Sequence, residues 1–166
     1  MKKFAIIIRG PTAAGKSTTS QLLKETLHKT IHLEVDVLRR IISHKPCAKR
    51  RKIAHKAVDV YLKELTKYGD NIIIEEVFRK PYYLKVCKFL KKKKYVLLRV
   101  FLSAPVEVLV HRDKIRQTKT LGKKSVSKMS KIIKPFDEDL FIDTSKTTPK
   151  ECAKLIVKKL KPLIKK

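Results

Sequence analysis

The residues best suited to chemistry are the eight from 10 to 17, which read Gly-Pro-Thr-Ala-Ala-Gly-Lys-Ser and fit G-x-x-x-x-G-K-[ST] in full. This pattern is typical of a phosphate-binding loop, whose glycines let successive backbone N–H groups turn toward one anion. Lys16 can reach the terminal phosphates and the Ser17 hydroxyl can ligate Mg²⁺, so the pattern predicts a site for a nucleoside triphosphate. The predicted nucleotide contacts are Gly10, Thr12, Ala13, Ala14, Gly15, Lys16, Ser17 and Thr18.

A carboxylate and a guanidinium follow the second apolar run of the chain. Asp36 comes directly after residues 31–35, and Arg39 lies one helical turn further on, on the same face. We expect Asp36 to act as a general base that accepts the proton of an attacking hydroxyl. Asp36 would also suit the N-cap of a helix, and the two roles are compatible. Arg39 could hold an anionic or polar part of the substrate.

Two more carboxylates, Glu75 and Glu76, follow the β-branched run 72–74 directly. A carboxylate at the tip of such a strand commonly orients Mg²⁺ or its water in phosphate-loop enzymes, where Asp is the usual residue. Ion pairs with neighbouring lysines are the alternative. Side chains alternate along a strand, so the sequence leaves open which of the two faces the site. We assign Glu75 to the metal, together with Ser17, and Glu76 to the substrate.

Arg112 and Arg116 are spaced i, i+4 and therefore project from one face of a helix. They precede a segment rich in Lys, Ser and Thr, and we expect a basic lid over about 112–134. Lid arginines could neutralise charge on the transferring phosphoryl group. The alternative is an ion pair within the helix, between Arg112 and its neighbour Asp113.

Apolar runs and helical periodicities alternate through the chain and predict a doubly wound α/β fold with a parallel sheet and helices on both faces. The expected strands are 4–9, 31–35, 72–74, 95–102 and 140–143. The expected helices are 17–29, 36–44, 50–68, 81–91, one opening at 103–105 and one at 149. Thr148 and Glu151 form a capping box for the last helix. Residues 117–134 are either a mobile segment or a small surface helix.

Length and composition bound the class of protein. The 166 residues suit one domain, 1–166, and 43% apolar with 34% charged residues indicate a globular protein. No apolar stretch approaches the roughly 20 residues that span a bilayer, and residues 4–8 are shorter than a secretory core, so we expect a cytoplasmic protein. Cys47, Cys87 and Cys152 are too far apart for paired zinc-site spacing.

The formal net charge of +27 allows two interpretations. Such a charge would raise the local concentration of nucleic acid or another polyanionic substrate. Most of the 42 basic residues are lysines spread along the chain, however, which is also typical of a solvated surface.

These motifs together resemble the compact phosphate-loop kinases, a group that includes polynucleotide 5′-hydroxyl kinases, chloramphenicol phosphotransferases, zeta toxins and small adenylate- or shikimate-type kinases. The resemblance rests on GPTAAGKS, VDVLRR, IIIEEVF, LSAPVEVLVHRDKIR and FIDTS. It implies a five-stranded parallel sheet of order 2-3-1-4-5 and an arginine-bearing lid over ATP. By matching position it makes Asp36 the base, Arg39 a substrate contact, and places Thr144 and Ser145 near the adenine.

The implied activity is an ATP- and Mg²⁺-dependent kinase that transfers the γ-phosphoryl group to a hydroxyl acceptor. Lys16, Asp36, Arg112 and Arg116 are its predicted catalytic residues. The basic charge favours a nucleic-acid 5′-hydroxyl or a nucleoside as acceptor. A small metabolite or antibiotic is the alternative, and a nucleotide-binding regulatory module with little turnover is a competing class. Glu in place of Asp after the third strand is a departure from many relatives.

Overall fold

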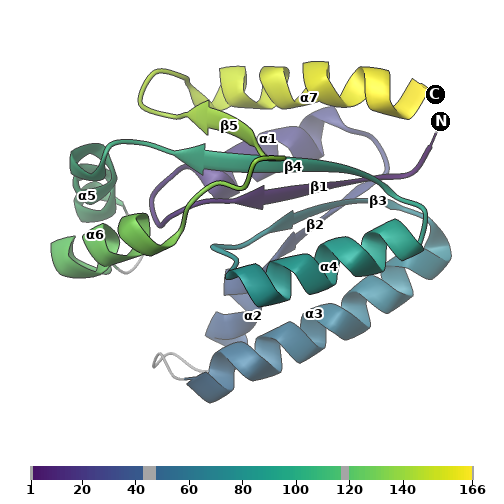
Figure 1. Cartoon of the computed structure of the whole chain (residues 1–166), viewed down its shortest axis with the longest axis horizontal. Helices are drawn as coiled ribbons and strands as arrows, with labels where there is room; N and C mark the ends of the chain where they lie inside the picture. The colour runs from purple at the N-terminus through teal and green to yellow at the C-terminus, as the bar shows by residue number, and fades with distance from the viewer. Residues whose placement is uncertain (1, 43–47, 117–119, 166) are drawn as a thin grey trace.

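A single sheet of five parallel strands organises the molecule (Figure 1). The computed structural model describes residues 2–42, 48–116 and 120–165. Within these ranges the sheet has the order β2-β3-β1-β4-β5, which confirms the predicted topology. The strands are β1 Phe4–Arg9, β2 Thr30–Glu34, β3 Asn71–Glu75, β4 Val96–Ser103 and β5 Leu140–Asp143.

Helices cover both faces of this sheet. Helices α1 and α7 lie on one face, whereas α3 and α4 lie on the other (Figure 1). Helices α5 and α6 lie together beyond the carboxyl ends of the strands. The helices of the described residues are α1 Lys16–Thr26, α2 Val35–Ile42, α3 Ala48–Tyr68, α4 Lys80–Lys92, α5 Val106–Ile115, α6 Lys123–Ile132 and α7 Pro149–Lys165.

The central strand β1 shows why the apolar runs become strands. All six of its residues are buried, as expected for a parallel sheet covered on both faces. Ile6 and Ile8 pack into the core under α1 and α7, whereas Ala5 and Ile7 pack into the core under α3 and α4. Strand β1 therefore ends, with its phosphate-loop sequence following, in the middle of the carboxyl edge.

Several local expectations have a clear outcome. The capping box is confirmed, because the Thr148 N–H donates to Glu151 Oε2 at 2.8 Å and the Glu151 N–H donates to Thr148 Oγ1 at 3.3 Å. The sequence predicts either a mobile segment or a small surface helix over residues 117–134, and Lys123–Ile132 of this segment form α6. Asp36 lies inside the first turn of α2, which begins at Val35, and not at its N-cap.

Other bounds differ from the predicted ones by a few residues, as helix and strand ends commonly do. Residues 43 and 44 of the predicted second helix, and Cys47, fall outside the described residues. Cys87 and Cys152 are buried free thiols. No helix in the described part of the chain combines the length and the apolar character needed to cross a membrane.

Candidate active site

The phosphate loop joins β1 to α1 and depends on its glycines. Gly10 has a φ of 144°, and a Cβ added there would meet the Leu102 carbonyl oxygen at 2.0 Å. Gly15 has a φ of 83° and forms the N-cap of α1. Lys16 is the first residue of α1, so the positive end of the helix dipole and the Lys16 ammonium face the same region. This geometry is that of an anion-binding loop.

The Lys16 side chain spans the loop. Its Nζ donates to the Pro11 carbonyl at 2.8 Å, and the residue is buried. Burial lowers the pKa of Lys16 below its ordinary value, and the nearby carboxylates of Asp36 and Glu75 oppose that shift. The site therefore holds its cation among carboxylates that lie at the ends of neighbouring strands.

Glu75 faces the phosphate loop. Its Oε1 accepts a hydrogen bond of 2.5 Å from the Ser17 hydroxyl, and His32 Nε2 lies 3.5 Å from its Oε2. Burial would raise the pKa of Glu75, but hydrogen bonds from His32 and Ser17 and the charge of Lys16 lower it below the usual range. Glu75 is therefore ionised at neutral pH.

The donor set at Ser17 and Glu75 suits Mg²⁺. A hydroxyl and a carboxylate are hard oxygen ligands, and Mg²⁺ is usually held by one or two such groups together with substrate phosphates. Within the residues that the structure describes, no group of three or more His, Cys, Asp and Glu side chains could hold a metal by itself. The arrangement fits a cation that arrives with a nucleotide.

Glu76 points away from the loop, into a second cluster. Its carboxylate contacts the Arg39 guanidinium, and His55 Nε2 lies 3.0 Å from its Oε1. Arg39 also donates from Nη1 to Asp36 Oδ1 at 2.7 Å. Glu76 and Arg39 are 2% and 15% exposed at the side chain, whereas Asp36 is 43% exposed. Asp36 thus accepts a hydrogen bond from Arg39 and is partly open to solvent.

His55 belongs to this cluster, and the sequence did not indicate it. The residue lies on α3, and its ring stacks on Tyr82 with centroids 3.6 Å apart and planes 3° from parallel. Burial, followed by the charges of Arg39 and Arg51, lowers the pKa of His55 to about 4. A single histidine on a helix has no spacing signal, and only the fold brings it beside Glu76.

The two predicted lid arginines have different partners. Arg112 lies on α5, and Arg116 is the C-cap residue directly after it. Arg112 donates to Thr144 Oγ1 at 2.9 Å and to the Thr144 carbonyl at 2.7 Å. The ion pair within the helix forms between Asp113 and Arg116, at 2.9 Å, so the pairing weighed for Arg112 is not the one observed. Burial is the main reason why the pKa of Lys16 is lowered, and the positive charge of Arg116 adds to that shift.

The described part of segment 112–134 consists of the end of α5, the helix α6 and short non-helical stretches. The Asp113 carboxylate accepts from the N–H groups of Leu121 and Gly122, both at 2.9 Å, just before α6. Val126 of α6 is completely buried. Residues 117–119 lie outside the described ranges, so a lid over 112–134 stays a prediction.

Thr144 and Ser145 follow β5, at the same edge of the sheet. The Thr144 N–H donates to the Ser103 carbonyl at 2.7 Å, which ties the end of β5 to the end of β4. The Ser145 N–H and hydroxyl both donate to Asp143 Oδ1, at 2.9 and 2.6 Å. The structure thus gathers the predicted site residues along one edge, and their individual roles stay predictions.

Comparison with known proteins identifies related sequences over nearly the whole chain. The sequence profile of the chloramphenicol phosphotransferase-like protein family matches residues 4–161. A Pyrococcus abyssi protein described as a "probable adenylyl-sulfate kinase" is 27% identical over 177 aligned positions, which cover 98% of each chain.

Solved structures share the fold. The gluconokinase of Sinorhizobium meliloti superposes with a TM-score of 0.75 at 16% identity, covering 98% of this chain and 94% of that one. The Mycobacterium tuberculosis APS kinase, solved with AMPPNP and APS, superposes with a TM-score of 0.72 at 14% identity, covering 96% and 98%. These similarities confirm a small phosphate-loop kinase fold.

Proposed function

This chain belongs to the chloramphenicol phosphotransferase-like protein family and is an ATP-dependent kinase, and from that premise we propose that it phosphorylates a hydroxyl group of a small molecule. The observation that carries the proposal is the placement of Asp36. Its carboxylate is partly open to solvent and contacts the Arg39 guanidinium. Its negative charge acts on Lys16 of the phosphate loop and opposes the lowering of the Lys16 pKa by burial.

Each residue of the site has a role in this reaction. The loop amides and Lys16 hold the phosphates of ATP, and Asp36 accepts the proton of the acceptor hydroxyl as its oxygen attacks the γ-phosphorus. Ser17 and Glu75 would hold Mg²⁺, which would supply positive charge to offset the charge of the triphosphate. Arg116, directly after α5, stabilises the charge of the transferring group.

Arg112 has a different part in the same scheme. It is bonded to Thr144, so we assign it to the nucleotide end of the site, where Thr144 and Ser145 would lie near the adenine. Charge is stabilised best by groups that are already fixed before the reaction. Arg112 meets that condition through its hydrogen bonds to Thr144, and Arg116 meets it through its ion pair with Asp113.

The acceptor cluster favours a small molecule over a nucleic-acid 5′-hydroxyl. Arg39 already contacts the two carboxylates of Asp36 and Glu76, so it does not offer an uncompensated positive charge to a polyanion. The family, the relative and the gluconokinase named above carry the names of small acceptors, namely chloramphenicol, adenylyl sulfate and gluconate. The alternative acceptor class weighed from the sequence is therefore the better supported one.

A transfer assay with γ-labelled ATP and Mg²⁺ tests the proposal. The acceptors are adenylyl sulfate, gluconate, chloramphenicol and a short oligonucleotide with a 5′-hydroxyl, assayed at low salt. We expect label on a small acceptor and none on the oligonucleotide. Label on the oligonucleotide alone would overturn the small-molecule assignment.

The variant Asp36→Asn tests whether the Asp36 carboxylate is the proton acceptor. It keeps the size of the side chain and loses the proton acceptor, so ATP affinity by calorimetry should stay within a few-fold while transfer falls by at least about 100-fold. Unchanged nucleotide turnover in Asp36→Asn, with no labelled acceptor, would instead favour a regulatory nucleotide-binding module.

A further inference from the structure

Arg9, the last residue of β1, is a buried cation that the reaction described above does not use. It directly precedes Gly10 and is 2% exposed. Its Nη1 donates to Asp139 Oδ2 at 2.7 Å, and its Nη2 donates to the Lys134 carbonyl at 2.8 Å. Both partners belong to the segment that links α6 to β5. Arg9 therefore joins the start of the phosphate loop to the end of α6.

Aromatic rings enclose this guanidinium. Its central carbon lies 4.0 Å from the ring centroid of Phe136 and 5.0 Å from those of Tyr83 and Phe101. The Asp139 carboxylate is equally enclosed. It accepts from the Tyr83 hydroxyl at 3.1 Å and from the Phe136 N–H at 2.9 Å, in addition to Arg9. Three elements, β1, α4 and the α6–β5 segment, thus meet on one ion pair.

Stability alone gives little reason for a charged pair at this place. Removing two charges from water is expensive, and well-packed apolar residues of similar volume often stabilise a protein equally well. Apolar contacts do not fix an orientation as hydrogen bonds do. Arg9 donates to two acceptors, Asp139 and the Lys134 carbonyl, and so sets the orientation of the segment that carries them. The pair is better suited to fixing a position than to adding stability.

The element that Arg9 holds is α6. The start of α6 is attached through Leu121 and Gly122 to Asp113 on α5, the helix that carries Arg112 and is followed by Arg116. Its end is attached through Lys134 and Asp139 to Arg9. Figure 1 shows α6 beside α5 beyond the carboxyl edge and the segment that returns from α6 to β5. Helix α6 is therefore attached at both ends, to Asp113 of α5 before its start and to Arg9 of β1 after its end.

We propose that Arg9 and Asp139 form a positioning pair, which sets α5 and α6 at the correct place relative to the phosphate loop for phosphoryl transfer. Arg9 touches neither nucleotide nor acceptor in this proposal and acts through Gly10 on one side and α6 on the other. The inference rests on phosphoryl transfer at this site and is independent of which acceptor is used.

Three variants test the pair by separating stability from activity. Arg9→Met and Asp139→Leu each leave one buried charge without its partner, and we expect each to lower Tm by on the order of 10 °C. The double variant Arg9→Met/Asp139→Leu removes both charges and should recover part of that loss, because the Tyr83 hydroxyl and the Phe136 N–H still lose their acceptor. Its kcat should nevertheless stay at least about tenfold below that of the wild type, with the Kd for MgATP within about threefold.

A neighbouring ion pair supplies the matched control. Arg99 of β4 pairs with Glu138, one residue before Asp139, and Glu138 is 64% exposed. The control variant Arg99→Met/Glu138→Leu should keep both kcat and Tm close to those of the wild type. A Arg9→Met/Asp139→Leu variant with recovered Tm and wild-type kcat would overturn the proposal, because the pair would then only fill space.

Arg9→Lys keeps the test decisive if the double variant does not fold. Lysine preserves the charge beside Asp139 but lacks the planar fork that reaches two acceptors. We expect a folded protein with several-fold lower kcat and faster amide exchange over residues 120–139 in the presence of MgATP. Wild-type exchange and wild-type kcat in Arg9→Lys would overturn the proposal. The exchange measurement needs no acceptor, so it separates this outcome from a wrong choice of acceptor.

Discussion

Glu75 and Glu76 are adjacent in the chain, yet they serve two different clusters. The alternation of a strand directs Glu75 to the Ser17 hydroxyl and Glu76 to the Arg39 guanidinium. The sequence placed both carboxylates at the edge of the sheet but could not choose between the two faces. The register of β3 beside β1, with Glu75 opposite Ile8, decides it.

His55 gives a prediction about pH at the scale of one residue. The ring is neutral in the folded protein because burial lowers its pKa to about 4. Arg39, Arg51 and Lys85 oppose its protonation, and Asp59 favours it, whereas the Glu76 carboxylate is already compensated by Arg39. In the unfolded chain a histidine has a pKa of about 6.5. Between these two values the unfolded state binds more protons, so stability falls as pH drops from about 6.5 to about 4.

We therefore expect the wild type to lose about 1 to 2 kcal/mol more than His55→Gln between about pH 7.5 and about pH 5, after discounting for the partial exposure of the ring. Urea denaturation of both proteins at the two pH values measures the difference. His28→Gln, at an exposed histidine after α1, is the control and should behave like the wild type. Equal losses in the wild type and His55→Gln would contradict the assignment.

At the scale of elements, α6 shows what periodicity misses. Val126 is the fully buried side chain of this helix, and the residues around it are mostly Lys and Ser, so no apolar stripe announces the helix in the sequence. Its start is fixed by a contact from another helix, the Asp113 carboxylate, which no local pattern reveals. The last helix is the opposite case, because the Thr148–Glu151 capping box is local and was predicted.

Val126→Ala tests whether α6 is packed onto the core. Removing two buried methyl groups should lower the free energy of unfolding by about 1 to 3 kcal/mol. Ile132→Ala on the same helix is the control. Ile132 is 52% exposed, so its truncation should cost no more than about 0.5 kcal/mol. Chemical denaturation of the two variants compares them, and equal losses would show that α6 packs differently.

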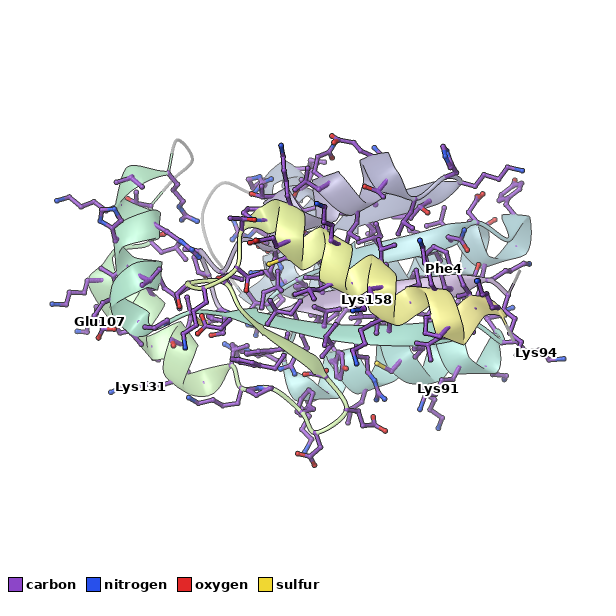
Figure 2. The ribbon with its side chains drawn as sticks, turned by 90° about the horizontal axis from the view of Figure 1, so that it is seen from above. Phe4, Lys91, Lys94, Glu107, Lys131 and Lys158 are labelled. Carbon is purple, nitrogen blue, oxygen red and sulfur yellow. The ribbon has the colours of Figure 1, made fainter. Side chains whose placement is uncertain are left out.

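At the scale of the whole molecule, the positive charge is widely distributed. Figure 2 shows Lys131 on α6, Lys158 on α7, and Lys91 and Lys94 at the end of α4 and after it, on different parts of the molecule. The carboxylates of the site, in contrast, are gathered at the carboxyl edge. The strand positions followed from apolar runs in the sequence, whereas the strand order followed from the resemblance to phosphate-loop kinases. The use of the charge did not, because a net charge carries no information about a site.

We expect nucleic acid to bind only through this diffuse charge. Oligonucleotides with a 5′-hydroxyl and with a 5′-phosphate should bind equally, and both should weaken by at least about tenfold between 50 and 200 mM salt. Fluorescence anisotropy with the two labelled oligonucleotides measures this. A preference for the 5′-hydroxyl that persists at the higher salt would restore nucleic acid as a candidate acceptor.

The absence of a side chain at Gly10 has a consequence for distant substitutions. Its α-carbon lies so close to the Leu102 carbonyl that a single methyl group would not fit between them. The anion cradle is thereby built against the backbone of β4, with no soft side chain between the two to absorb a shift. We expect substitutions that move β1 and β4 apart, even at their far ends near Phe4 and Val96, to disturb phosphate binding at the loop.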